Sequence, residues 1–127
     1  MTLEQAIHTV DELKPNQIER ARKIAWLSQL DHRIFHVLML PRALDAGAPD
    51  TFSPYGQDTH PDTVLLAKAP YDEIYRFYLE MQIDLANLEY DKYNNSAALY
   101  ANAWGQLARA GHRKHAPKEP AGAYLKF

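Results

Sequence analysis

The eight prolines of this chain limit where helices can form. Proline lacks the backbone N–H that a helix interior needs, and the residue before it avoids the helical region. Pro15 therefore ends a first helix and Pro41 ends a second, whereas Pro70 fits the first turn of a third. Between residues 41 and 63, prolines and glycines recur too closely for any helix. The chain is thus restricted to a few helices joined by irregular segments.

Two capping-box patterns mark the starts of the first two helices. Thr2 with Gln5 is one, and Asn16 with Glu19 is the other. The second helix is expected from about residue 17 to residue 40. Its apolar stripe leaves Asp31 and other polar residues mostly to one side.

A third helix is expected after Pro70, and a fourth after a break near residues 87–91. The fourth helix is expected to end near Gly111, a plausible C-cap. Apolar residues recur at helical spacing in all four segments. Those expected to face the core are Leu3, Ala6, Ile7, Val10, Trp26, Leu27, Leu30, Ile34, Val37, Leu38, Ile74, Phe77, Met81, Leu85, Leu88, Tyr93, Ala97, Tyr100, Trp104 and Leu107. The sequence predicts an all-α bundle of about four helices.

The segment from 41 to 63 is a long irregular loop with two large side chains, Phe52 and Tyr55. The run Thr63–Leu66 is β-prone, so a short hairpin is expected around residues 51–67. A loop of this length in a small domain is often functional or held by a neighbouring chain.

Apolar periodicity stops after Gly111. Residues 112–122 are rich in basic residues and proline, and the tip that follows ends in three large apolar side chains. We interpret residues 1–111 as a helical domain and residues 112–127 as an extended C-terminal arm that docks on a partner.

The composition excludes several classes of protein. A formal net charge of −2 does not suit a chain that coats nucleic acid. The absence of cysteine excludes disulfides, thiol catalysis and thiolate metal sites, and it fits a reducing cytoplasm. No signal peptide and no membrane span are expected, because the apolar runs are only a few residues long.

No constellation of residues predicts catalysis, and neither a metal nor a cofactor is expected. His32 and His36 share one helix face, but the glutamate of the zinc-protease motif and a third ligand are missing. They are interpreted as surface histidines. Ser28, Ser53 and Ser96 lack the glycines of a nucleophile elbow.

Acidic residues gather in the third helix. Glu80 and Asp84 are four residues apart, and Asp72 and Glu73 suit the positive end of the helix dipole. The expected result is a solvated acidic face rather than an acid–base pair. Residues 72–91 carry six acids and one arginine, whereas residues 109–127 carry five lysines and arginines and one glutamate. This segregation suits head-to-tail association between identical neighbours.

Aromatic and basic residues near the C-terminus raise the question of nucleic-acid binding. Tyr90, Tyr93, Tyr100 and Trp104 have helical spacing and are interpreted as core residues rather than as a base-stacking platform. The basic cluster is short and lacks interleaved aromatic residues, which favours a protein-docking arm. It consists of Arg109, Arg113, Lys114 and Lys118.

An ordered set of short motifs covers nearly the whole chain. The motifs are Leu13-Lys14-Pro15-Asn16, Trp26-Leu27-x-x-Leu30-Asp31-x-x-Ile34, Phe52-x-x-Tyr55, Thr63-x-Leu65-Leu66, Pro70-Tyr71-Asp72-x-Ile74-Tyr75, Tyr78-Leu79-x-x-x-Ile83-Asp84-x-Ala86-Asn87-x-Glu89, Tyr93-Asn94-Asn95-Ser96 and Arg113-x-His115-x-Pro117. Together they resemble the head–tail connector (adaptor) proteins of tailed bacteriophages and prophages. The chain departs from the pattern between Ala97 and Ala110, which is unusually rich in alanine.

The resemblance implies a structural role. Such adaptors are small helical bundles that form a ring, here expected to be a dodecamer, beneath the portal protein. The ring links the DNA-filled head to the next connector, stopper or tail protein, and DNA passes through it without specific binding. The expected location is the head–tail interface of the virion, after synthesis in the bacterial host cytoplasm.

The resemblance also implies contact residues. The C-terminal arm would reach the portal through Arg113, Lys114, His115, Pro117, Lys118, Tyr124, Leu125 and Phe127. The loop that carries Phe52, Pro54 and Tyr55 would touch a neighbouring subunit or the next ring.

Two other classes stay open from the residues themselves. One is a small DNA-binding accessory protein that uses residues 109–118. The other is a metal-dependent enzyme that uses His32, His36 and a carboxylate.

Overall fold

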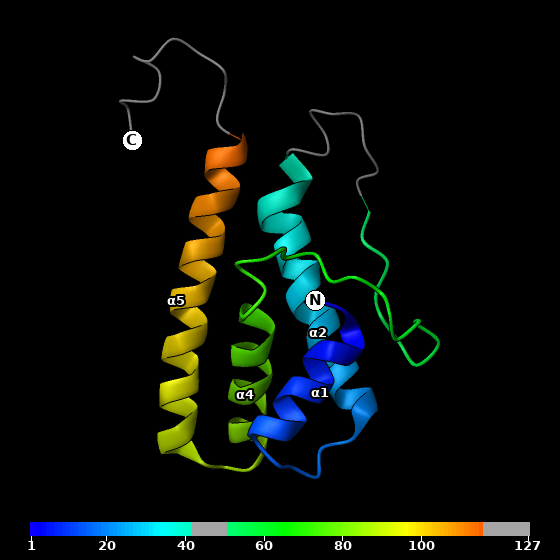
Figure 1. The fold of residues 1–127 in the computed structure, drawn as a ribbon. Helices are drawn as coiled ribbons and strands as arrows, with labels where there is room; N and C mark the ends of the chain where they lie inside the picture. The colour runs from blue at the N-terminus through cyan, green and yellow to red at the C-terminus, as the bar shows by residue number, and fades with distance from the viewer. Residues whose placement is uncertain (42–50, 116–127) are drawn as a thin grey trace.

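The computed structural model describes residues 1–41 and 51–115, with side chains as far as Gly111. The helices are α1 (Leu3–Leu13), α2 (Arg20–Ile34), the π-helix η1 (Phe35–Met39), α4 (Ile74–Ala86) and α5 (Tyr90–His115). They form an elongated bundle with α5 along one edge and α1 toward the other (Figure 1). The prediction of an all-α bundle of about four helices is confirmed.

The first helix forms as the sequence predicts. The Thr2 backbone N–H donates to Gln5 Oε1 at 2.9 Å, and the Gln5 N–H donates to Thr2 Oγ1 at 3.2 Å, which completes the capping box. Leu3, Ile7 and Val10 are buried on the inner face of α1, together with Ala6.

The second capping box does not form, and α2 begins at Arg20 rather than near residue 17. The Asn16 side chain instead accepts from Ile18 N–H at 3.0 Å and donates to the Lys14 carbonyl at 2.9 Å. Asparagine bonds its own backbone readily, and here that local turn delays the helix.

The end of the second helix is a π-helix, in which the Leu40 N–H bonds the Phe35 carbonyl. The wider turn changes which residues share a face. Val37, predicted in the core stripe, is therefore 51 % exposed, while Leu38 packs on the core.

The third helix, α4, contacts α1, α2 and α5, so it buries more than one stripe. Tyr75, which is not among the residues expected to face the core, is fully buried. Leu85 and Leu88, predicted as core, are exposed near the turn between α4 and α5, where Leu88 has a positive φ of 58°. Pro70 does not open α4, which begins four residues later.

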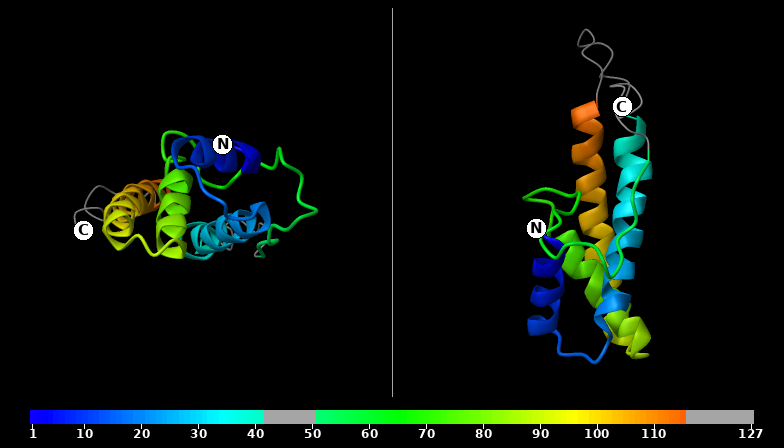
Figure 2. Two further views of the ribbon diagram at one scale, coloured as in Figure 1. Left: turned by 90° about the horizontal axis from the view of Figure 1, so that it is seen from below. Right: turned by 90° about the vertical axis from the view of Figure 1, so that its right-hand side faces the viewer.

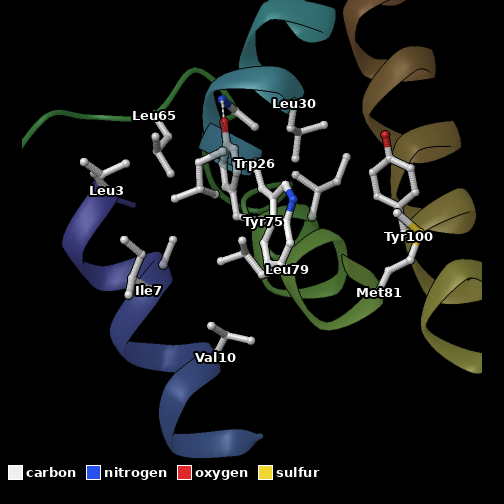
Figure 3. Close-up of a cluster of buried hydrophobic side chains, with 14 of the residues drawn as sticks. Leu3, Ile7, Val10, Trp26, Leu30, Leu65, Tyr75, Leu79, Met81 and Tyr100 are labelled. Carbon is white, nitrogen blue, oxygen red and sulfur yellow. Dashed lines mark hydrogen bonds between the residues drawn. The ribbon is translucent and has the colours of Figure 1, made fainter. Parts of the chain in front are cut away.

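The core lies where α1, α2 and α4 meet, and α5 closes one side (Figure 3). Side chains of α1 point toward Tyr75 and Leu79 of α4, and Leu65 covers Leu3 from the loop side. Tyr100 and Leu107 of α5 are buried and extend the core to this helix, as predicted.

The predicted hairpin around residues 51–67 is wrong. In the part of the chain that is described, the one β-type pairing is an isolated antiparallel bridge between Thr2 and Val64. The Leu3 N–H donates to the Thr63 carbonyl at 2.9 Å, and the Leu65 N–H donates to the Met1 carbonyl at 3.0 Å. The β-prone run 63–66 therefore pairs with the chain's first residues, whose backbone N–H and carbonyl groups precede or begin α1 and so lack partners within the helix.

The fourth helix runs past Gly111 to His115, so the predicted C-cap and the predicted start of the arm at residue 112 are wrong. At Gly111 an added Cβ would lie 3.6 Å from the Leu38 side chain, which marks a close helix contact rather than a helix end. The backbone of Arg113, Lys114 and His115 is helical. Pro117, Lys118, Tyr124, Leu125 and Phe127 lie outside the described residues.

Candidate functional site

A buried carboxylate, Asp31, joins α2 to the loop and to α4. The Tyr55 hydroxyl and the Leu66 N–H donate to Asp31 Oδ2 at 2.6 and 3.1 Å, and the Tyr75 hydroxyl donates to Oδ1 at 2.6 Å. The Tyr75 oxygen in turn accepts from the Ala67 N–H at 2.6 Å. We call Asp31, Tyr55, Leu66, Ala67 and Tyr75 the Asp31 network. It holds residues from three separate elements with one carboxyl group.

Burial controls the ionisation of this network. Loss of solvent raises the pKa of Asp31, and the hydrogen bonds from Tyr55, Tyr75 and Leu66 oppose that rise without cancelling it. Burial and the neighbouring Asp31 also raise the pKa of the Tyr55 and Tyr75 hydroxyls above their ordinary value. Both tyrosines therefore stay protonated and donate hydrogen bonds, which suits a structural role and not acid–base catalysis.

The loop is also fixed by an aromatic contact with α2 and η1. Phe52 stacks on the His32 ring at 5.4 Å between centroids and lies 6.0 Å from the Phe35 ring. The Tyr55 N–H donates to Ser28 Oγ at 3.0 Å. Phe52 and Tyr55, predicted as partner contacts, are thus half-buried anchors within the chain.

The outward side of residues 51–57 consists of uncharged residues. Ser53, Pro54 and Gly56 are exposed, and the Gly56 N–H donates to Thr59 Oγ1 at 2.8 Å. Of the three predicted contact residues in the loop, Pro54 alone presents an exposed side chain. The next residue, Asp58, is exposed and charged, so the uncharged part of the loop ends at residue 57.

The predicted solvated acidic face is wrong for its two central members. Asp84 is 1 % exposed and accepts from Lys14 Nζ at 2.6 Å and from the Ser96 hydroxyl at 2.7 Å. Glu80 is buried and pairs with Arg76 at 3.2 Å. Four-residue spacing does place both acids on one face, but that face meets other elements of the bundle instead of water.

The outer acids of the same segment are also paired within the chain. Glu73 is exposed and lies 3.4 Å from Arg76, and Asp72 lies 3.6 Å from the terminal ammonium of Met1. The acidic segment therefore offers a basic arm much less free charge than its composition suggests.

The inner face of α5 is part of the core, as predicted for Tyr93, Tyr100 and Trp104. Arg33 of α2 lies over the Trp104 ring at 4.0 Å and donates to the Tyr100 hydroxyl at 3.0 Å. Tyr90 is the exception, because it stands at the first residue of the helix and is 61 % exposed.

The outer face of α5 lacks charge. Residues 93–108 contain no Asp, Glu, Lys or Arg. The exposed positions include Asn94, Ala98, Leu99 and Asn102. A hollow of about 210 Å³ lies beside this face, lined by Pro70, Glu73, Phe77, Leu99, Asn102 and Gln106, among others. An uncharged helix face beside a hollow is typical of a surface that packs against another protein, since interface cores are depleted in charge.

The described residues give little support for a metal site or for a nucleophilic serine. Among the residues described, no three His, Cys, Asp or Glu side chains are grouped to hold a metal ion. His32 and His36 are exposed, with their rings 4.5 Å apart. Ser28 and Ser96 bond Tyr55 and Asp84, so both are structural. No described helix is long and apolar enough to cross a membrane.

Comparison with known proteins gives no match: no family model, no curated protein and no solved structure is significantly similar to this chain. The sequence places Asp31 off the apolar stripe and inside one of the connector-like motifs, but it does not predict the buried role of this residue. An acid near the middle of a predicted helix gives no local signal that distinguishes a buried acid from an exposed one.

Proposed function

We propose that this chain is a head–tail connector (adaptor) subunit of a tailed bacteriophage. In this role it forms a ring beneath the portal protein and links the DNA-filled head to the next connector or tail protein. DNA passes through the ring without specific binding.

One observation carries the proposal: the residues of the motifs that resemble the connector family contact each other. Asp31, Tyr55, Leu66 and Tyr75 come from four different motifs, and they meet in the Asp31 network. A family that keeps this fold would have to retain these contacts, because they hold the loop to α2 and α4.

The second buried carboxylate, Asp84, also joins residues from different motifs. Lys14, Asp84 and Ser96 come from three further motifs, and they form one buried cluster with distances of 2.6 and 2.7 Å. The resemblance therefore concerns the residues that make the fold, which supports carrying the family's role over to this chain.

The fold is consistent with a ring subunit in its details. A domain of this size buries only about two-thirds of its unfolded surface, so contacts with neighbours add stability that the core lacks. Phe52 and Tyr55 of the loop are anchored on α2 before any partner arrives, which lowers the entropy cost of binding through this segment.

The test is assembly on the portal protein encoded in the same genome. The full chain and a version that ends at His115 are each mixed with that portal protein, and complexes are isolated and viewed by electron microscopy. Ending at His115 keeps α5 whole, so the comparison isolates residues 116–127. We expect a ring on the portal with the full chain, and a folded but weakly bound protein with the shortened one.

Two results would overturn the proposal. One is failure of the full, folded chain to bind the portal protein. The other is binding of the full chain to duplex DNA in low salt, with affinity that falls steeply as salt is added, because that is the behaviour of a protein that neutralises phosphates. The second result would assign the function to the basic segment 109–118 instead.

A further inference from the structure

We propose that neighbouring copies of this chain join through two uncharged surfaces: the loop 51–57 of one copy packs on the outer face of α5 of the next. This inference rests on the proposed ring and identifies the surfaces that build it. Because the two surfaces differ, each copy contacts one neighbour through its loop and the other neighbour through its α5 face.

The first surface is the outer face of α5. In this chain 24 % of residues are charged, so about four charged residues would be expected among the sixteen from 93 to 108. There are none, and Leu99 in the middle of this face is 46 % exposed. Exposed helix faces in water are normally charged. This face has the composition of a covered one.

The second surface is the loop 51–57, which also contains no charged residue. Its apolar side chains are turned inward, where Tyr55 bonds Asp31 and Phe52 stacks on His32. Backbone and small side chains at Ser53, Pro54 and Gly56 remain outside. Backbone groups and small side chains of this kind can approach the α5 face closely. The one charged side chain that lines the hollow beside this face, Glu73, is already paired with Arg76.

The two surfaces lie on opposite edges of the bundle. In Figure 1 and in the left view of Figure 2, α5 forms one edge and the loop forms the other. A contact between opposite edges is heterologous, and repetition of it gives a ring when the rotation closes. A contact between two α5 faces would instead give an isolated pair.

The hollow beside α5 supplies a place for the loop. Leu99 and Asn102 belong both to the uncharged face and to the lining of the hollow, with Phe77 below them. Asn102 and Gln106 carry amides that can donate to and accept from loop backbone groups.

The size of the contact predicts how it behaves. Residues 94–106 of a helix span about 20 Å, and one helix face of that length is smaller than the roughly 800 Å² per partner of a standard stable interface. Two free copies should therefore associate weakly, and the contact should persist when the portal holds many copies side by side.

The absence of cysteine allows a direct test. Full-length chains with Pro54→Cys, with Asn102→Cys and with both substitutions are treated with a bifunctional maleimide, free at high concentration and bound to the portal protein. The double variant should give a ladder of cross-linked species beyond the dimer. A mixture of the two single variants should stop at the dimer, and each single variant alone should stay monomeric. Gln17→Cys paired with Pro54→Cys is the matched control, since residue 17 is exposed and outside both surfaces.

Each outcome decides between the two proposals. A ring on the portal without the 54–102 ladder overturns this inference and leaves the connector role intact. A dimer from Asn102→Cys alone overturns it as well, because the α5 faces would then pack on each other. A ladder without portal binding supports the contact and removes the connector role.

A charge variant gives independent evidence without cross-linking. Asn102→Glu places a charge in the hollow, and we expect it to fold as before but to lose ring formation on the portal. Ala25→Glu, at an exposed alanine of α2, is the matched control and should keep the ring. Rings formed equally well by both variants would contradict the proposed contact.

Discussion

At the scale of single residues, the structure depends on two buried carboxylates, Asp31 and Asp84. Within the described residues, every buried side-chain nitrogen and oxygen has a hydrogen-bond partner. Satisfied polar groups of this kind specify one arrangement of the chain, because any other arrangement leaves a buried group unpaired. The two acids therefore select this packing of helices and loop rather than simply adding stability.

Asp31→Ala should destabilise the protein by about 3 kcal/mol, because it leaves the donors of Tyr55, Tyr75 and Leu66 without their acceptor. Asp31→Asn keeps an acceptor oxygen and should cost less. The measurement is urea unfolding followed by circular dichroism. Asp58→Ala, at an exposed loop position, is the control and should change stability by less than about 0.5 kcal/mol. Equal stability of Asp31→Ala and the unaltered protein would rule out the network.

Alkaline pH should weaken the fold through Tyr75. The pKa of Tyr75 is raised in the folded state, so its contribution is fully present below the unfolded pKa near 10 and is lost as pH rises above it. Above pH 10, stability should fall by about 1.4 kcal/mol per pH unit for this group, and Tyr75→Phe should remove that part of the slope. Tyr90→Phe, at an exposed tyrosine outside the network, is the matched control. The same alkaline slope in Tyr75→Phe and the unaltered protein would show that the hydroxyl is not a buried donor.

At the scale of helices and loops, patterns in the sequence predicted most elements and failed where packing decides. The capping box at Thr2 and the break near residue 87 are local, and both were predicted. The π-helix at Phe35–Met39 was not, since its i→i+5 bonds leave no periodic signal in so short a segment. Asp84 was assigned to solvent because spacing identifies a shared face but not what covers that face.

The site was predictable only in part, because local patterns identify its residues but not the contacts that they make. The loop was recognised by its prolines, and Phe52 and Tyr55 were recognised as its large side chains. Which way they point depends on Asp31, more than twenty residues earlier in the chain, and a local pattern contains no such information.

Lys14→Met should destabilise the bundle by about 2 kcal/mol, since it leaves the Asp84 carboxylate buried with Ser96 as its remaining side-chain partner. This value is below that of a fully buried pair because the Lys14 side chain is partly exposed. Thermal unfolding measures the change. Lys92→Met removes an exposed pair with Glu89 and should leave the melting temperature unaltered. Similar melting temperatures for the two variants would contradict a buried role for Asp84.

Gly111→Ala should stabilise the protein by about 0.5–1 kcal/mol, because residue 111 is inside a helix and an added Cβ would make ordinary contact with Leu38 at 3.6 Å. Chemical unfolding measures this change. A helix-ending glycine would respond in the opposite direction, since alanine is disfavoured at positive φ. Destabilisation would therefore place the end of α5 at residue 111.

At the scale of the whole molecule, acids and bases of the bundle largely pair within one chain. Arg76 lies between Glu73 and Glu80, and Lys14 bonds Asp84. The helix segment 93–108 and the loop segment 51–57, proposed to join neighbouring copies, contain no charged residue. The composition suggested that identical copies associate through opposite charges. This arrangement instead favours association through shape and hydrogen bonding.

Salt should therefore have little effect on contacts between ring subunits. Raising sodium chloride from about 0.05 to 0.5 M should change the 54–102 cross-link yield on the portal only slightly, because screening acts on exposed charges and the one charge that lines the hollow, Glu73, is already paired with Arg76. A steep loss of cross-linking with salt would indicate that opposite charges join the copies after all.

The Asp31 network also has a consequence for the order in which the chain opens. Its groups come from α2, the segment 55–67 and α4, so detachment of that segment breaks the bonds to Asp31 and Tyr75 but not the contacts between the helices. The amides of Leu66 and Ala67 bond side-chain oxygens, not helix carbonyls. In native-state hydrogen exchange these two amides would report detachment of the loop as a separate, lower-energy event than unfolding of the bundle. The segment 55–67 would then open while the helices remain intact, which makes it a distinct unfolding unit of the chain.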